Sequence, residues 1–204
     1  ARQGRQRLAF EELLCLGMGF ARLKEGRSSQ RACAMESRDL APFFHSLPFT
    51  PTGAQKRAIS QAVEDLCREV PMNRLVQGDV GSGKTLVAAA CCYFAFLNGR
   101  QSAMMAPTEL LAEQHFKTLT GLLSPLGVRV GLLTGSTGAK EKKQIKAALE
   151  AGELDLCIGT HALLTGDVSW AGLGLVVTDE QHRFGVAQRM ALTAKGEGVH
   201  TLVM

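Results

Sequence analysis

Long apolar runs are missing from this sequence of 204 residues. No stretch approaches the roughly 20 apolar residues that a helix needs to cross a bilayer, so we expect no membrane span. The basic first residues, 1–7, are not followed by the apolar stretch and small-residue cleavage site of a signal peptide. We therefore expect a protein of the cytoplasm.

Aromatic residues account for only 5% of the sequence, and the net charge is only +4. Most of that charge comes from residues 1–40, where eight Lys and Arg residues face five acidic ones. Such a faint basic bias permits a polyanionic partner but does not establish one. The apolar share of 46% and the charged share of 21% are ordinary for a globular chain. They exclude a largely disordered protein, and the length predicts one sizeable core.

Pairs of cysteines with C-x-x-C spacing are also absent. The six cysteines are Cys15, Cys33, Cys67, Cys91, Cys92 and Cys157. Most of them lie in apolar stretches, where a thiol behaves as a small buried hydrophobe. We therefore predict reduced, buried thiols instead of a disulfide framework or a zinc site.

Short apolar runs alternate with longer amphipathic segments from residue 47 onward. Strands are expected over 74–77, 102–106, 128–133, 155–159, 174–179 and 201–204. Helices are expected over 53–69, 84–98, 109–123, 140–151 and 184–194. Strands that are almost wholly apolar and alternate with helices indicate an α/β fold, with a mostly parallel sheet covered by helices on both faces. Ligands of such sheets bind at the carboxyl ends of the strands.

A different pattern precedes residue 47. A helix is predicted over 8–24, a polar stretch over 25–30 and a weaker helix over 38–45. The expected organisation is therefore a helical linker segment, 1–46, followed by one α/β domain, 47–204. The basic linker either touches a nucleic acid or packs on the domain as a solvated helix, and its small charge without interleaved aromatics favours packing.

The run GDVGSGKT fits the phosphate-loop pattern G-x-x-x-x-G-K-[ST]. Its glycines let the backbone curl so that successive N–H groups point at phosphate oxygens. Lys84 supplies a charge for the β- and γ-phosphates, and the Thr85 hydroxyl is a ligand for Mg²⁺. An ordinary glycine-rich turn is the alternative, but a strand before and a helix after favour a nucleotide site. The predicted contacts are Gly78, Gly81, Gly83, Lys84 and Thr85.

An apolar strand ends in two carboxylates, Asp179 and Glu180, about a hundred residues after the phosphate loop. Asp179 is a candidate Mg²⁺ ligand, and Glu180 is placed to orient or deprotonate the attacking water. Together with Lys84 they form the predicted catalytic set. Alone, the pair would indicate a solvated loop. His182 is either a loop histidine or a polar relay from the γ-phosphate to a neighbouring domain.

A further candidate lies upstream, where Thr52 is a plausible N-cap of the helix over 53–69. Gln55 on the first turn of that helix has an amide that can both donate to and accept from the N6/N7 edge of adenine. Taken alone, a solvated surface glutamine is the better interpretation. The adenine contact therefore depends on the rest of the pattern.

Together these motifs resemble those of superfamily 2 helicases, and within them the RecG family of bacterial ATP-dependent DNA helicases. The matching segments are Thr52 to Gln55, GDVGSGKT at 78–85, APTELLAEQH at 106–115, LLTGS at 132–136, GTHALL at 159–164 and DEQHRFG at 179–185. The resemblance implies a RecA-like P-loop domain that uses ATP and Mg²⁺, in which Gln55 recognises adenine. It covers nearly the whole chain.

The resemblance also implies a nucleic-acid track and a set of partners. The matching track residues are Pro107, Thr108, Gly135, Ser136, Thr160 and His161. Such hydroxyls, backbone N–H groups and an imidazole grip phosphates without reading sequence. A lone loop histidine at 161 and a plain turn at 134–136 are equally open alternatives. The implied partners are branched or forked DNA and the second RecA-like lobe and wedge domain of a longer, monomeric parent.

Two other functions remain open. In the related transcription–repair coupling translocase an aromatic usually replaces Ser82, and Asp-Glu-Glu-Gln replaces the tetrapeptide from Asp179 to His182, so this chain favours RecG. A non-catalytic ATP-dependent scaffold would not need Glu180.

Because the family's next motif would begin near Met204, we expect a truncated lobe without the arginine finger, which is worth roughly 10³–10⁵ in rate. Such a fragment should bind Mg-ATP weakly, hydrolyse it barely and not unwind DNA.

Overall fold

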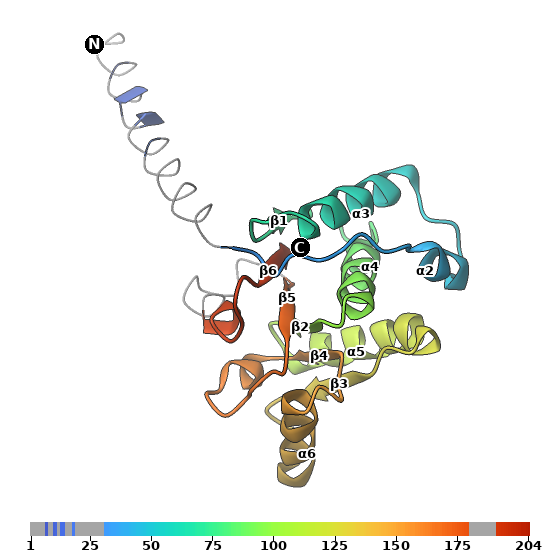
Figure 1. Ribbon diagram of the computed structural model, residues 1–204, viewed down its shortest axis with the longest axis vertical. Coiled ribbons are helices and arrows are strands. Elements are labelled where there is room, and N and C mark those ends of the chain that lie inside the picture. Colours follow the sequence, from blue (N-terminus) through green and yellow to red (C-terminus); the bar gives the residue numbers. More distant parts are fainter. Residues whose placement is uncertain (1–6, 8–9, 12, 15–17, 19–30, 180–190) are drawn as a thin grey trace.

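The computed structural model describes residues 7, 10–11, 13–14, 18, 31–179 and 191–204 (Figure 1). The α-helices are α2 (Ala41–Ser46), α3 (Gly53–Leu66), α4 (Lys84–Leu97), α5 (Glu109–Leu123) and α6 (Ala139–Glu150). The strands are β1 (Asn73–Leu75), β2 (Gln101–Met105), β3 (Val130–Leu133), β4 (Leu156–Gly159), β5 (Leu173–Thr178) and β6 (His200–Val203). Two short 3₁₀ turns are η1 (Ser124–Leu126) and η2 (His161–Leu164). Among the described residues, no helix is both long enough and apolar enough to span a bilayer.

The described strands form one six-stranded sheet in the order β1-β6-β5-β2-β4-β3. Every neighbouring pair is parallel. In the centre of the sheet, Met104 lies opposite Ile158 on one side and Val177 on the other. All carboxyl ends therefore lie along one edge, which is where ligands of parallel sheets bind.

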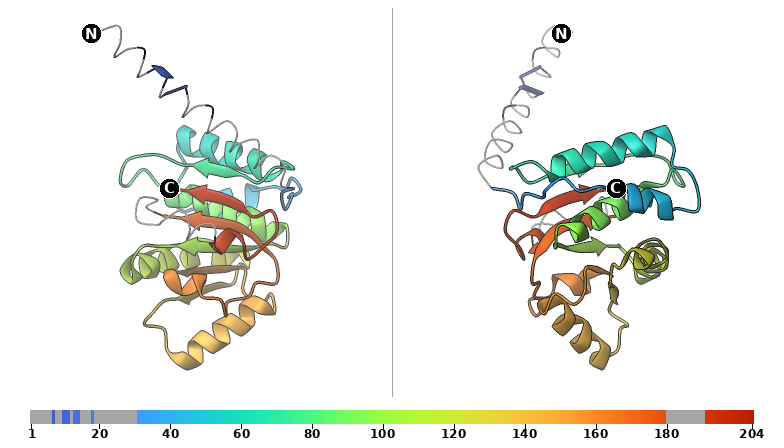
Figure 2. Two further views of the ribbon diagram at one scale, coloured as in Figure 1. Left: turned by 90° about the vertical axis from the view of Figure 1, so that its left-hand side faces the viewer. Right: turned by 45° about the vertical axis from the view of Figure 1, so that its right-hand side comes forward.

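Helices cover both faces of the sheet (Figure 2). Met104, Ile158 and Val177 belong to the core on the face of α3, α4 and α5. Their neighbours along the strands point to the opposite face, because successive side chains of a strand alternate. There Met105 and Val176 pack in a second core with Leu149 of α6. This arrangement confirms the predicted α/β fold with a parallel sheet flanked by helices.

Helix α4 is the central helix of the larger core. Its side chains are buried without interruption from Leu86 to Ala95. A helix that is apolar on all sides has no solvent face and must be enclosed by other elements. The first turn of α4, which begins at Lys84, is therefore held in one place by the packing behind it.

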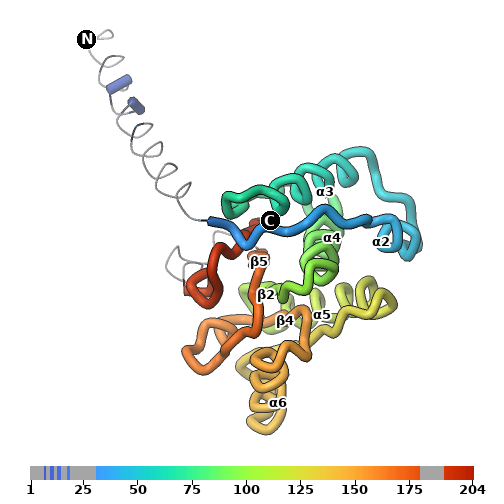
Figure 3. The backbone as a smooth tube through the Cα atoms, in the orientation of Figure 1, coloured from blue at the N-terminus to red at the C-terminus, as the bar shows by residue number. Residues whose placement is uncertain are grey.

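The extended chain before α2 and α2 itself pack on the domain. Figure 3 shows the segment after residue 31 passing alongside α3 on its way to α2. The Ala32 N–H donates to the Glu69 carbonyl at 2.7 Å, and the Phe43 ring stacks on Tyr93 with centroids 5.9 Å apart. The helix expected over 38–45 is shorter, because α2 begins with a proline in its first turn. The helices predicted over 8–24 and 184–194 lie largely outside the described residues.

Candidate nucleotide and nucleic-acid sites

The phosphate loop lies between β1 and the buried helix α4. Gly81 and Gly83 have φ angles of 81° and 82°, in the left-handed region where a side chain causes strain. At Gly78 the constraint is closeness, since a Cβ there would lie 2.7 Å from the Ser82 hydroxyl oxygen. The glycines predicted from the motif therefore have separate geometric reasons to be glycine.

Lys84 points back into the curl of this loop. Its ammonium donates to the carbonyls of Gly78 at 2.7 Å and Asp79 at 3.1 Å. Thr85, partly buried, follows it in the first turn of α4, where backbone N–H groups have no partner within the helix. A cation beside a helix N-terminus is an anion-binding arrangement.

Gln55 lies against the phosphate loop. Its side chain completes a capping box, because Thr52 Oγ1 accepts from the Gln55 N–H at 3.2 Å and Gln55 Oε1 accepts from the Thr52 N–H at 2.9 Å. Gln55 Nε2 also donates to the Ser82 carbonyl at 3.0 Å. A carboxamide has two donors and two lone pairs. One donor thus joins α3 to the loop and one lone pair closes the cap of α3, so one donor and one lone pair are left for a ligand.

An ion pair positions α3 relative to the strand that leads into the loop. Arg74 of β1 donates to Asp65 of α3 through both Nε, at 2.7 Å, and Nη2, at 2.6 Å. Both nitrogens reach the same oxygen, Oδ2, and this charge-assisted pair holds α3 beside β1. This pair was not predicted from the sequence, because its partners belong to different elements.

Asp179 follows β5 at the same edge of the sheet. Its backbone N–H donates to the Met105 carbonyl, and its Oδ2 lies 2.7 Å from His115 Nε2 on α5. Both side chains are largely buried, with exposed fractions of 12% for His115 and 16% for Asp179. Glu180 and His182, the other predicted residues of this motif, lie outside the described residues.

His115 is a residue of this site that the sequence analysis did not select. One sequence signal was available: His115 lies three residues after Ala112 and four before Leu119, both buried on the sheet-facing side of α5. A polar side chain on such a stripe needs a buried partner. The identity of that partner, 64 residues away, follows only from the tertiary structure.

The predicted nucleic-acid residues follow the neighbouring strands β2, β4 and β3. Thr108 caps α5 by accepting from the Leu111 N–H at 3.3 Å, directly after Pro107. Beyond β4, Thr160 is buried and its N–H reaches the Leu133 carbonyl at the end of β3. His161 is exposed at the start of η2.

The loop after β3 is tied to both helices beside it. Glu109 of α5 accepts from the Ser136 N–H at 3.1 Å, and Lys142 of α6 donates to the Gly135 carbonyl at 2.6 Å. Interaction with the Ser136 side chain, helped by Lys142, lowers the pKa of Glu109. The carboxylate therefore stays ionised and holds the loop. The structure thus links the segments of Thr108, Gly135 and Ser136.

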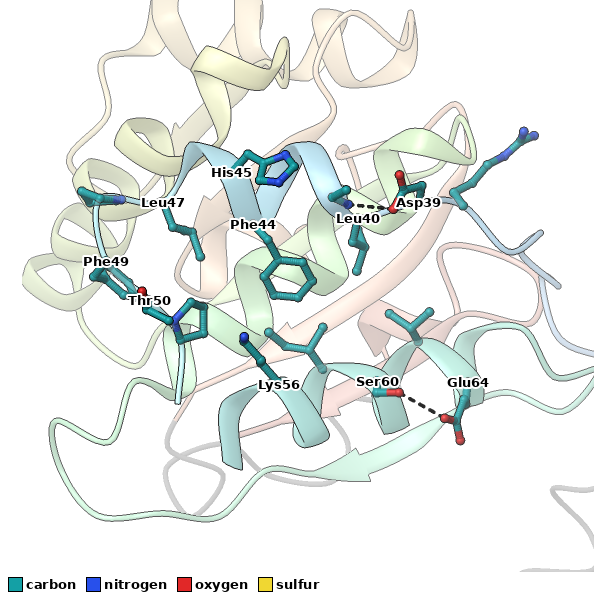
Figure 4. A pocket seen from close by; sticks show the side chains of 16 residues that line it. Asp39, Leu40, Phe44, His45, Leu47, Phe49, Thr50, Lys56, Ser60 and Glu64 are labelled. Atoms are coloured by element: carbon teal, nitrogen blue, oxygen red, sulfur yellow. Dashed lines mark hydrogen bonds between the residues drawn. The ribbon is translucent and has the colours of Figure 1, made fainter. Parts of the chain in front are cut away.

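A separate cleft of about 980 Å³ lies between α2 and α3 (Figure 4). Phe44 and Leu47 line it from the side of α2, and Ile59 and Val63 line it from α3. No phosphate-loop residue contributes to its lining. The candidate phosphate site is therefore a backbone cradle and not this cleft.

No group of three or more metal-ligating side chains occurs in the described part of the chain. Mg²⁺ does not require one, since it usually takes one or two carboxylates, several waters and the phosphates of a nucleotide. Thr85 and Asp179 supply a hydroxyl and a carboxylate from two elements at the same sheet edge. Their chemistry fits Mg²⁺.

A wholly parallel sheet, a phosphate loop before a buried helix and an acidic residue at the end of β5 define a RecA-like P-loop domain. The family model for "DEAD/DEAH box helicase" matches residues 52–197. The chain therefore belongs to the DEAD/DEAH box helicase family.

Within that family its similarity is to RecG. It is 46% identical to the ATP-dependent DNA helicase RecG of Thermotoga maritima, over 99% of this chain and 26% of the relative. It is 45% identical to RecG of Escherichia coli K12, over 94% of this chain and 28% of the relative. The chain thus spans about a quarter of the length of these relatives.

Comparison with solved structures supports the same family and fold. The structure of RecG bound to a three-way DNA junction matches with a TM-score of 0.88 and 44% identity, over 98% of this chain and 27% of that chain. A DEAD box protein of Methanococcus jannaschii matches with a TM-score of 0.62 and 18% identity, over 82% of this chain and 47% of that chain. The second match supports the fold alone. The predicted fold and the family resemblance are both confirmed.

Proposed function

We propose that this chain is the first motor lobe of an ATP-dependent DNA helicase of the RecG type. The observation that carries the proposal is the ammonium of Lys84, held inside a curl of left-handed glycines at the N-terminus of a buried helix. That arrangement binds the phosphates of a nucleotide. RecG-type similarity over nearly the whole chain supports a helicase as the enzyme that uses it.

The nucleotide roles are divided among three elements. Gly78, Gly81 and Gly83 let the loop enclose the phosphates, and Lys84 neutralises their charge. Gln55, already fixed to the loop through Ser82, offers its remaining donor and acceptor to the adenine edge. Nucleotide binding therefore depends on α3 as well as on the loop.

Thr85 and Asp179 would hold Mg²⁺ beside the phosphates. A bound magnesium ion neutralises charge that develops on the transferred phosphoryl group. Glu180 orients or deprotonates the attacking water, and His182 relays the state of the γ-phosphate. We assign catalysis to Glu180, Lys84 and Asp179.

The nucleic-acid partner is branched or forked DNA, as RecG similarity suggests. Pro107, Thr108, Gly135 and Ser136 form one part of the track, joined through Glu109. Thr160 and His161 extend it beyond β4. These groups contact the DNA backbone through hydroxyl, amide and imidazole groups and do not read bases.

The proposed parent enzyme is a cytoplasmic monomer with further domains. Residues 47–204 form the first lobe and residues 1–46 a linker, whose described part packs on the lobe through Ala32 and Phe43. A second lobe supplies the arginine finger, and a wedge domain supplies fork selectivity. The isolated chain should therefore bind Mg-ATP weakly and hydrolyse it very slowly.

Two substitutions test these assignments. In this chain, Lys84→Ala should weaken binding of a fluorescent ATP analogue at least tenfold, whereas Lys117→Ala, an exposed lysine of α5, should not change it. In the full-length enzyme, Glu180→Gln should preserve ATP affinity but abolish turnover and fork unwinding. Unaltered turnover would reject a hydrolytic motor in favour of a nucleotide-dependent scaffold.

A further inference from the structure

The hydrogen bond between His115 and Asp179 joins the two halves of the carboxyl edge. Asp179 follows β5 on the nucleotide side, whereas α5 begins directly after the track residue Thr108 on the nucleic-acid side. The 2.7 Å bond is enclosed, since neither side chain is more than 16% exposed. It connects the two predicted sites directly.

We propose that His115 is a positioning residue for Asp179, so that the proposed magnesium site depends on the placement of α5. The inference rests on the proposed function, in which Asp179 is a magnesium ligand. Carboxylates that ligate metals are themselves held by hydrogen bonds from neighbouring groups, and loss of such a partner typically lowers metal affinity by about 10–100-fold.

The direction of the bond follows from its chemistry. An ionised carboxylate has no proton to give, so His115 Nε2 must carry the hydrogen and donate it. The bond takes one oxygen of Asp179, Oδ2, and thereby restricts the rotation of the carboxylate. The remaining lone pairs then have a defined direction. His115 itself touches neither nucleotide nor metal in this scheme.

The same helix also holds the nucleic-acid loop. Glu109, in the first turn of α5, accepts from the Ser136 N–H at 3.1 Å, and His115 lies six residues further along. Buried Ala112 and Leu119 fix this helix against the sheet. Helix α5 is thus one rigid body that contacts the loop after β3 at its start and Asp179 in its middle.

A purely structural role for His115 is the competing explanation. In that case His115 only satisfies a buried carboxylate, and its loss lowers stability without a specific effect on magnesium. The two explanations differ in which substitution of His115 should preserve magnesium affinity. Glutamine extends a donor to nearly the position of Nε2, whereas asparagine is polar but too short to reach it.

The test compares His115→Gln, His115→Asn and His115→Leu in the full-length enzyme. We expect the Mg²⁺ concentration for half-maximal DNA-stimulated ATP hydrolysis to rise about tenfold in the Asn and Leu variants and less than threefold in the Gln variant. Electron paramagnetic resonance of Mn²⁺ bound with a non-hydrolysable ATP analogue should show the same order of affinities. Nucleotide affinity in EDTA should be equal in all variants.

Asp179→Asn separates the two proposals. A raised Mg²⁺ requirement in Asp179→Asn, without a rise in His115→Leu and His115→Asn, would overturn the positioning role alone. An unaltered requirement in Asp179→Asn would overturn Asp179 as the metal ligand. Should His115→Leu fail to fold, the comparison of Gln with Asn decides, because equal Mg²⁺ requirements in those two would also overturn the positioning role.

Discussion

Gly83 carries two constraints in one residue. Its φ of 82° lies in the left-handed region, and a Cβ would lie 2.4 Å from Gln55 Nε2. Any side chain would therefore strain the loop and displace the glutamine that joins it to α3. The left-handed turn into α4 and the close contact with Gln55 therefore both require glycine at this position.

Replacing Gly83 by alanine should weaken binding of a fluorescent ATP analogue at least tenfold and cost about 1–2 kcal/mol of stability from the left-handed backbone. Gly99→Ala is the matched control, since Gly99 has a φ of 64° but a Cβ added there would have no atom within 4 Å. The control should lose similar stability and keep its nucleotide affinity. Equal affinity losses in both variants would contradict the loop-specific explanation.

Four of the five cysteines that the structure describes are buried, as a small hydrophobe would be. Of those that the structure describes, Cys33, Cys91, Cys92 and Cys157 are buried and Cys67 is partly exposed, and all are free thiols. Burial raises the pKa of Cys92 and of Cys157 to about 12. Such thiols stay protonated at neutral pH and are poor nucleophiles.

At the scale of elements, helices α3 and α5 bring site residues to the sheet edge. Helix α3 carries Gln55 and is held at its start by the capping box and further along by Asp65. Helix α5 carries Glu109 and His115. Each helix therefore determines the position of a loop or strand end that lies far away in sequence.

Loss of the α3 cap should affect stability and the phosphate loop together. Thr52→Ala removes the acceptor for the Gln55 N–H, so we expect the free energy of unfolding to fall by about 1 kcal/mol in urea titrations. Affinity for the ATP analogue should also fall, because the first turn of α3, which carries Gln55, loses the bond that caps it. Thr52→Ser retains the hydroxyl and should restore both quantities. An alanine variant with unchanged stability would show that the cap is dispensable.

Substitution of Glu109 can show whether this residue affects DNA binding by positioning the loop after β3 or only by its charge. Removing a carboxylate near DNA should strengthen binding if only charge matters, since phosphate contacts dominate affinity. Because Glu109 holds the Ser136 loop, we expect Glu109→Ala to weaken DNA binding of the full-length enzyme several-fold. Glu113→Ala removes an exposed charge from the same helix and is the control. Tighter binding by both variants would argue for charge alone.

At the scale of the whole molecule, His200 joins segments from both ends of the described chain. Its Nδ1 accepts from the Met72 N–H at 3.0 Å, so Nε2 carries the proton and donates to the Cys33 carbonyl at 2.9 Å. Burial lowers the pKa of His200, with partial opposition from the bond to Cys33 and from Asp65. The neutral ring is therefore part of the fold, and it holds the segment before α2 onto the sheet.

Stability should consequently depend on pH through His200. Its folded-state pKa lies below the unfolded value of about 6.5, so the unfolded chain takes up a proton first as the pH falls. The contribution is complete above about pH 6.5 and is lost below it, with a slope of at most about 1.4 kcal/mol per pH unit. Urea titrations at several pH values should show a smaller slope in His200→Gln than in the wild type. His45→Gln, at an exposed site, should keep the wild-type slope.

Much of the fold could be predicted from local pattern. The helix predicted over 109–123 coincides with α5, and predicted strands agree with β2, β4, β5 and β6 within one residue. One larger difference has a tertiary cause: β3 starts at Val130 because Arg129 is held by Asp155, which accepts from its backbone N–H and its guanidinium. Propensity and periodicity do not report such contacts.

The class of fold, the phosphate loop and the family could be predicted without the structure, because each depends on residues that lie close together along the chain. The tertiary structure alone decided which distant groups meet: Gln55 with Ser82, Arg74 with Asp65, and His115 with Asp179. The order of parallel strands places these groups together, and no local rule specifies it, since each strand pairs through backbone groups common to all residues. The motifs of the candidate site can therefore be recognised in the sequence, but their residues contact one another only when the sheet forms.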